Sequence, residues 1–396
     1  MTHNVLFGLL LATGLLISTS VSAEWYEAVG QAEIRRGDKD NAQQRAIQDA
    51  VKHALLFSGA TVNSIQEVSD GVLTNNAMKI MSSGSVQSIE LINETHTANS
   101  VMVTIRLDIT SEQNQCTTSD FKKSIAITQF NLSDQAQAKI GGLYYLGKDF
   151  AKKLTQNIER DSFKLVARPW YQKKLNLDAF RSEYFSADDA LIEQISARSD
   201  SQFVLFGTLT DVSMGDKVSS DLTFWRDDVY DRYFAVEYII FDAFTKELID
   251  RNQITLSADW TFNLKESINT NSSKFWHSTY GQAIERVASQ LQINIEEQLA
   301  CQQLEGKILK VIDNQVVVNL GKENGVEPGQ TFIVAHRTNG KGPSSKTLPA
   351  YTVTQYKIRI EQSHQHSAIG SSIDDMLLGN VQEDDVILLA PINEFD

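Results

Sequence analysis

The chain has 396 residues, of which 42% are hydrophobic and 22% charged, and its net charge is −14. These proportions are typical of a globular protein, and the length suffices for two or three domains. The acidic balance excludes nucleic acid and anionic membrane surfaces as expected partners, because phosphate binding depends on Lys and Arg.

The first 23 residues predict export. An uncharged apolar run, Val5–Val21, ends in the small residues Val21-Ser22-Ala23. This is the organisation of a secretory signal peptide, and the run is too short for a membrane span. We expect cleavage between Ala23 and Glu24. The mature chain would then be soluble and contain no transmembrane segment.

Residues 24–110 predict a compact α+β domain. The alternating stretch Trp25–Ile34 has the period of a strand. Small residues then recur every fourth position, which predicts a helix that approaches a sheet closely: Ala42, Ala46, Ala50 and Ala54. Two further strands are predicted at Val86–Glu94 and Ser100–Ile109, the second from strict alternation of apolar and polar residues.

Residues 111–303 alternate strands with helices, which predicts a mixed α/β sheet covered by helices. The predicted strands are Ser124–Phe130, Phe163–Ala167 closed by Pro169, Gln202–Leu209, and a long hairpin of Tyr233–Phe244 with Leu248–Phe262. The predicted helices have apolar stripes over Ile140–Ile158, Ala187–Ala197 and Tyr280–Leu299. This segment is the expected middle domain.

Residues 304–396 consist of short strands and turns and predict a small β-barrel or sandwich. The predicted strands are Gly306–Val311, Gln315–Leu320, Thr331–Ala335, Tyr351–Glu361 and Val386–Leu389, with a loop over Thr338–Leu348. Asp313-Asn314 fits a two-residue hairpin turn, and Pro328-Gly329 suits a type II turn. The whole chain is therefore expected to be an α+β, multidomain protein.

Two cysteines, Cys116 and Cys301, remain in the predicted exported chain. An even pair in an oxidising compartment is most simply a disulfide. Both lie near the ends of the middle segment, and the ends of a domain are often close in space. Two free redox thiols are the alternative, and the absence of Cys-x-x-Cys spacing disfavours it.

Patterns for catalysis and metal binding are weak. His364 and His366 are two residues apart, so on a strand they would share one side and could share a metal. A third ligand would have to come from Asp374 or Asp375, and a solvated loop is the favoured interpretation. Ser119-x-x-Lys122 matches a nucleophile pattern whose companion motifs are absent. We assign no catalytic residue, no metal and no cofactor.

Two acidic clusters complete the candidate sites. Asp227, Asp228 and Asp231 lie in an aromatic and basic stretch, Phe224–Tyr233, which reads as a loop. Such a loop is either an interaction surface, since Trp, Tyr and Arg dominate binding hot spots, or it packs its own aromatic rings. Neither it nor Glu383–Asp385 has the spacing of a calcium loop.

Several of these features together resemble a known family. They are the opening strand Trp25–Ala32, the Ala-rich helix, the middle α/β domain and the turn Gly325–Gln330. In this order they closely resemble the FlgT family of flagellar assembly proteins, found in vibrios and related bacteria with sheathed flagella. The strongest pieces are Trp25–Leu56 and Glu305–Val334. Taken alone, the middle domain is similar to the N-terminal domain of TolB, a periplasmic accessory protein.

The resemblance implies a non-enzymatic part of the flagellar basal body in the periplasm. Proteins of this family build the H ring around the LP ring and support the MotX/MotY ring, which helps to hold stator units. The implied partners are the LP ring, MotX/MotY, other H-ring proteins and further copies in a ring. The family supplies no motif from which binding residues could be assigned. The alternative is a TolB-like periplasmic binding module that contacts outer-membrane proteins or peptidoglycan.

Overall fold

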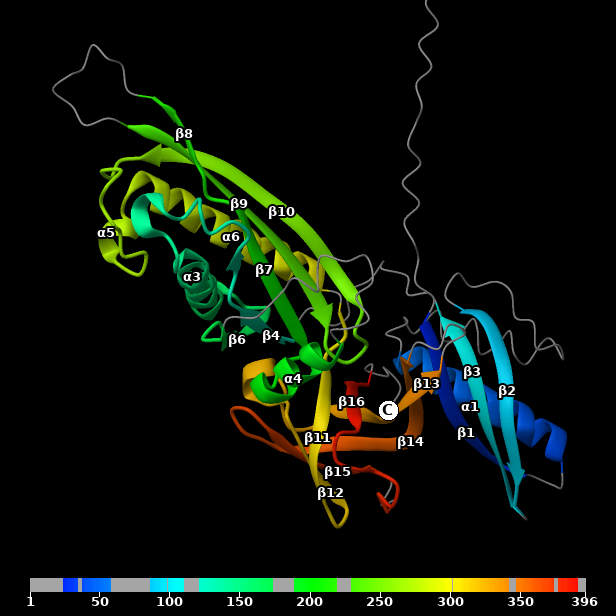
Figure 1. Cartoon of the computed structure of the whole chain (residues 1–396). Helices are drawn as coiled ribbons and strands as arrows, with labels where there is room; N and C mark the ends of the chain where they lie inside the picture. Colours follow the sequence, from blue (N-terminus) through cyan, green and yellow to red (C-terminus); the bar gives the residue numbers. More distant parts are fainter. Residues whose placement is uncertain are drawn as a thin grey trace, which may run out of the picture.

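The computed structural model describes residues 24–34, 38–57, 86–97, 99–109, 121–173, 189–218, 229–300, 302–341, 347–373 and 377–390. These residues form a nine-stranded and a seven-stranded sheet with their covering helices (Figure 1). Several residues named above lie outside the described residues, so the predictions made on them stay predictions: Ala23, Cys116, Ser119, Asp227, Asp228, Cys301, Asp374 and Asp375.

The N-terminal unit is one helix packed on three strands. Its elements are β1 (Glu24–Glu33), α1 (Lys39–Phe57), β2 (Val86–His96) and β3 (Ser100–Ile109). The four alanines of α1 are fully buried. A Cβ atom on Gly30 of β1 would lie 2.1 Å from the carbonyl oxygen of Ala46. The small residues therefore bring the helix and strand backbones into direct contact, as the alanine spacing predicts.

The C-terminal strands close into a six-stranded barrel. They are β11 (Glu305–Ile312), β12 (Gln315–Val318), β13 (Thr331–Lys341), β14 (Thr347–Ser363), β15 (Ala368–Ser372) and β16 (Val386–Leu389). Their order is β13-β16-β11-β12-β15-β14, and pairing of β13 with β14 closes the ring. Of the two predicted alternatives, barrel or sandwich, the chain adopts the barrel.

The middle module is a mixed sheet of order β10-β9-β7-β4-β6. Its main strands are β4 (Lys123–Thr128), β6 (Leu165–Trp170), β7 (Phe203–Asp211), β9 (Tyr230–Asp242) and β10 (Leu248–Trp260). Two short strands, β5 (Asn131–Leu132) and β8 (Met214–Lys217), pair with β7 and β9.

Helices cover both faces of this sheet. They are α3 (Leu146–Asp161), α4 (Asp189–Ser199), α5 (Ser273–Trp276) and α6 (Thr279–Leu299). Successive side chains of β4 point to opposite faces of the sheet. Ile125 and Ile127 pack in the core that contains α3 and α6, whereas Ala126 packs in the core that contains α4. Figure 1 shows α6 lying along the curved hairpin of β9 and β10. The predicted mixed α/β architecture is confirmed.

The helix predicted from Ile140 instead starts at Leu146. Gly141 and Gly142 have φ values of 83° and 66°, and this left-handed backbone ends the short 3-10 turn η1 (Ile140–Gly142). Ile140 and Tyr144, which the apolar stripe included, are exposed as a result.

Two further differences concern strand ends. β6 continues past the predicted stop at Pro169, because β6 lies at the edge of the sheet, where a missing N–H group costs no ladder hydrogen bond. The loop predicted over Thr338–Leu348 begins and ends in strand, since β13 extends to Lys341 and β14 starts at Thr347. Strand β15 was not predicted.

Candidate functional site

The N-terminal unit joins the barrel through β1. On one side β1 pairs antiparallel with β3 from Glu24 to Glu33; on the other it pairs in parallel with β14, with Ala28 opposite Val353. The four alanines of α1 share one apolar core with residues of the barrel strands and with Phe244 of the middle module. The N-terminal unit therefore completes its core on the other two modules.

The middle module meets the barrel in a polar contact that we call the seam: Arg168 of β6, and Glu323 and His366 of the barrel. Both terminal nitrogens of the Arg168 guanidinium donate hydrogen bonds to the Glu323 carboxylate, and Nη1 lies 3.3 Å from Oε2. Nδ1 of His366 lies 2.8 Å from the same oxygen. Burial favours a raised pKa for Glu323, but the hydrogen bonds from Arg168 and His366 outweigh it and hold the pKa below its ordinary value.

Amide groups continue the contact on both sides of the seam. Asn324 exchanges two hydrogen bonds with the main chain of Lys122, each 3.1 Å long. Nδ2 of Asn319 donates to the Asp200 carboxylate at 2.6 Å. Because all these contacts are directional, they orient the middle module on the barrel more narrowly than apolar packing would.

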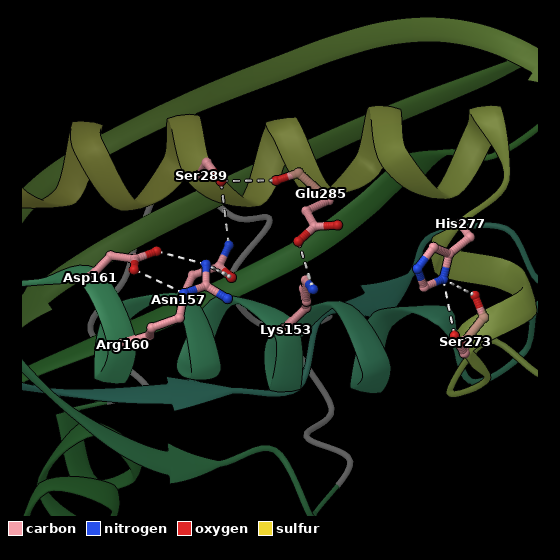
Figure 2. A network of polar contacts seen from close by, with 8 residues as sticks. All are labelled: Lys153, Asn157, Arg160, Asp161, Ser273, His277, Glu285 and Ser289. Atoms are coloured by element: carbon pink, nitrogen blue, oxygen red, sulfur yellow. Dashed lines mark hydrogen bonds and ion pairs between the residues drawn. The ribbon is translucent and has the colours of Figure 1, made fainter.

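A second polar network joins α3 to α6 inside the middle module (Figure 2). Nζ of Lys153 lies 2.7 Å from Oε1 of Glu285 and 5.4 Å from the centroid of the Trp276 ring. Nδ2 of Asn157 donates to Ser289 at 3.4 Å. All these partners are side chains of packed helices, so the network holds α3 against α6.

Figure 2 also shows a serine and a histidine in contact at the end of α5. Oγ of Ser273 lies 3.0 Å from Nδ1 of His277, and the same nitrogen lies 2.8 Å from the Ser273 carbonyl oxygen. Both residues are exposed. Activation of a serine requires a base held by a third group, and among the described residues no carboxylate contacts His277. The pair reads as a local helix-end contact.

His364 and His366 lie in the exposed turn between β14 and β15, in agreement with the favoured interpretation of a solvated loop. His366 contacts Glu323, whereas His364 accepts a hydrogen bond from the main-chain N–H of Lys322 through its carbonyl oxygen at 2.8 Å. Within the described ranges there is no group of three or more His, Cys, Asp or Glu that could hold a metal. In the sequence, the only indication of the contact between His366 and Glu323 was that an acidic residue lies in the Gly321–Gly325 turn.

The other candidate residues also lie in structural contacts. Nζ of Lys122 donates to the Ser162 carbonyl oxygen at 3.3 Å. Asp385 accepts from Nδ1 of His336 at 2.9 Å and from the N–H of Gln382 at 2.7 Å, which ties β13 to the turn before β16.

The loop predicted over Phe224–Tyr233 is wrong at its end, because β9 already starts at Tyr230 and includes Asp231. Its neighbour Arg232 is fully buried, which no sequence pattern indicated. The guanidinium lies 4.3 Å from the centroid of the Trp260 ring, and Nε donates to the Val212 carbonyl oxygen at 3.1 Å. Burial lowers the pKa of Arg232.

Comparison with known families assigns the three modules to domains of one protein family. Three models of flagellar assembly protein T match the chain: the N-terminal domain over residues 24–111, the middle domain over 114–270 and the C-terminal domain over 313–389. This chain belongs to the flagellar assembly protein T family. Membership in the family confirms the resemblance seen in the sequence and makes the protein a structural component of flagellar assembly and motility.

Solved structures resemble the chain only distantly. The hypothetical protein CT253 from Chlamydia trachomatis is 14% identical, with a TM-score of 0.30 over 46% of this chain and 98% of that one. The PelC dodecamer from Paraburkholderia phytofirmans is 9% identical, with a TM-score of 0.25 over 46% and 90%. TolB from Acinetobacter baumannii is 11% identical, with a TM-score of 0.23 over 63% and 46%. Similarities this low carry no functional argument.

None of the curated proteins matches the chain in sequence. Among the described residues, no helix has both the length and the apolar character needed to span a bilayer.

Proposed function

We propose that this protein is a non-enzymatic building block of the flagellar basal body in the periplasm. Copies of it would form the H ring around the LP ring and support the MotX/MotY ring and stator attachment. The observation that carries this proposal is the match of all three family domains in their family order. The modules would be 24–110, 111–303 and 304–396, after a signal peptide over 1–23.

The contacts between modules support a ring role. A subunit of a closed ring needs surfaces that meet head to tail, and a subunit whose modules move freely presents no fixed angle between them. Here β1 extends the barrel sheet, and the seam orients the middle module on the barrel. The subunit therefore offers several faces at set angles to one another.

Within this proposal, the N-terminal unit is needed for assembly onto the basal body. Deletion of residues 24–109, with the signal peptide kept, tests that role. Basal bodies isolated from that strain should lack the outer ring in electron micrographs, and the cells should lose motility. A chain that restores normal rings and motility without these residues would contradict the role that we assign to the N-terminal unit.

The alternative is a periplasmic binding module of the TolB kind that contacts outer-membrane proteins or peptidoglycan. Isolation of basal bodies separates the two, because a ring subunit copurifies with them and a separate binding module does not. Intact mass measurement of the periplasmic protein would test two further proposals: cleavage between Ala23 and Glu24, and a Cys116–Cys301 disulfide. A mass that shows two free thiols would contradict the disulfide.

A further inference from the structure

A cleft of about 720 Å³ opens on the middle module, beside the first turn of α3. Its walls come from that turn, from Tyr171 directly after β6, and from the loop 267–271. Helix α3 leads from β4 to β6, and these two strands are parallel. The cleft therefore lies at the carboxyl end of parallel strands, where sheets of this kind bind ligands. Its volume falls within the usual range of ligand pockets, about 300–1,000 Å³.

Two lysines lie on one wall of the cleft. Lys148 and Lys152 are partly buried and lie one turn apart on α3. Nζ of Lys152 donates to a neutral acceptor, Oδ1 of Asn271, at 3.0 Å. In the part of the chain that the structure describes, neither lysine forms an ion pair. Like charges at this spacing repel each other, and an anion between the two lysines would relieve that repulsion.

The nearest carboxylate is turned elsewhere. Asp149 lies between the two lysines in sequence, but it accepts a hydrogen bond from the Thr270 hydroxyl. Burial raises the pKa of Asp149 in spite of that hydrogen bond and of both lysines. Among the described residues, the two ammonium groups thus line the cleft without an ion pair to Asp149, in a chain whose net charge is −14.

The remaining walls have the chemistry of a sugar site. Tyr144 is 50% exposed and Tyr145 71% exposed, and both line the cleft. A tyrosine ring offers an apolar face and a polar edge, which match the C–H face and the hydroxyl groups of a pyranose. Asn269 and Asn271 also line the cleft, and an asparagine side chain can both donate and accept hydrogen bonds.

We propose that this cleft binds an acidic saccharide, a sugar that carries a carboxylate. The carboxylate lies between Lys148 and Lys152, and the sugar rings lie against Tyr144 and Tyr145. An acidic peptide would also satisfy the lysines, but acidic peptide motifs are recognised by clusters of arginine, and the described residues that line this cleft include no arginine. Amide and hydroxyl groups form the wall of this cleft instead. The proposal goes beyond the ring role and does not depend on it.

The test is calorimetric titration of the full mature protein with three probes. One is the disaccharide of N-acetylglucosamine and N-acetylmuramic acid, which carries a carboxylate; the second is chitobiose, its neutral counterpart; the third is a penta-glutamate peptide. We expect the acidic disaccharide to bind at least tenfold more tightly than chitobiose, and less tightly at high salt. Equal affinity for the two sugars, tighter binding of the peptide, or no binding at millimolar disaccharide would each overturn the proposal.

Variants locate the binding in the cleft. Lys148→Gln with Lys152→Gln should weaken disaccharide binding at least tenfold, whereas the exposed pair Lys164→Gln with Lys310→Gln, with the same change in charge, should leave it unchanged. Tyr145→Ala should weaken binding and Tyr145→Phe should retain it, because the ring face persists. Circular dichroism confirms that each variant is folded. Full binding by the cleft lysine pair variant would refute the assignment even if the protein joins basal bodies normally.

Discussion

The seam between the middle module and the barrel makes a quantitative prediction. Replacement of Arg168 by Met removes the guanidinium and keeps an unbranched apolar stem like that of arginine. The Glu323 carboxylate then remains in a site where its side chain is only 11% exposed, with His366 as its remaining partner. Replacement of Glu323 by Gln leaves the opposite charge on the Arg168 guanidinium, whose side chain is 18% exposed. Its Nε already has no hydrogen-bond partner among the residues that the structure describes.

The magnitude follows from this geometry. Breaking a fully buried ion pair costs about 3–5 kcal/mol, because it leaves an uncompensated charge. The seam is not fully buried, and His366 stays beside Glu323, so we expect Arg168→Met to lower the free energy of unfolding by about 2 kcal/mol. The double variant should lose clearly less than the sum of the two single losses, since it contains neither unpaired charge.

Urea unfolding of the four proteins in this double-mutant cycle measures the coupling. The control is Arg160→Met, which removes an arginine from an exposed pair with Asp161 and should leave stability unchanged. A coupling below about 0.5 kcal/mol would show that the two side chains contribute no more than a surface pair does.

The pH dependence provides a second check. In the folded protein the pKa of Glu323 lies below its ordinary value of 4.5. The stability that the Glu323 carboxylate contributes is therefore fully present above pH 4.5, and it is lost as the pH falls through the pKa of the folded state. The unfolding free energy of the Glu323→Gln variant should lack this acid-sensitive part. An identical loss in the variant and the parent between pH 5 and pH 3 would contradict the reasoning.

Three other substitutions test the packing. Gly30→Ala should destabilise the N-terminal unit by about 3 kcal/mol or more in thermal unfolding, because the new Cβ would overlap the backbone of α1. The control Gly379→Ala should have no effect, because there is open space around Gly379. Arg232→Met should lower the unfolding free energy by about 1–3 kcal/mol, since the main-chain carbonyl groups of Val212 and Gln137 lose the guanidinium as a donor. Burial raises the pKa of Asp242 to about 6, so folding loses stability as pH rises from about 4 through 6. Asp242→Asn keeps a side-chain oxygen that accepts from the N–H groups of Phe244 and Thr245. In urea unfolding, this variant should be more stable than the parent by about 1–2 kcal/mol at pH 7.5, and by less at pH 4.

The sequence by itself determined most of the elements. The alanine spacing of α1, the alternation in β3 and the apolar run of β9 each report which face of an element is buried, and that property is local. The resemblance to the family rested on the same local stretches, and the three domain matches confirm it. The error in the predicted start of α3 also had a local cause: α3 starts at Leu146, after two consecutive glycines with positive φ.

Only the tertiary structure decided which elements meet. Ala28 pairs with Val353 although the two lie in the first and last modules, and Arg168 finds Glu323 across the boundary of two others. The cleft of the middle module likewise joins Lys148 to a loop more than a hundred residues later, at Asn271. The hydrophobic periodicity of a sequence does not identify such partners. It indicates whether a side chain faces inward or outward, but not which residue packs against it.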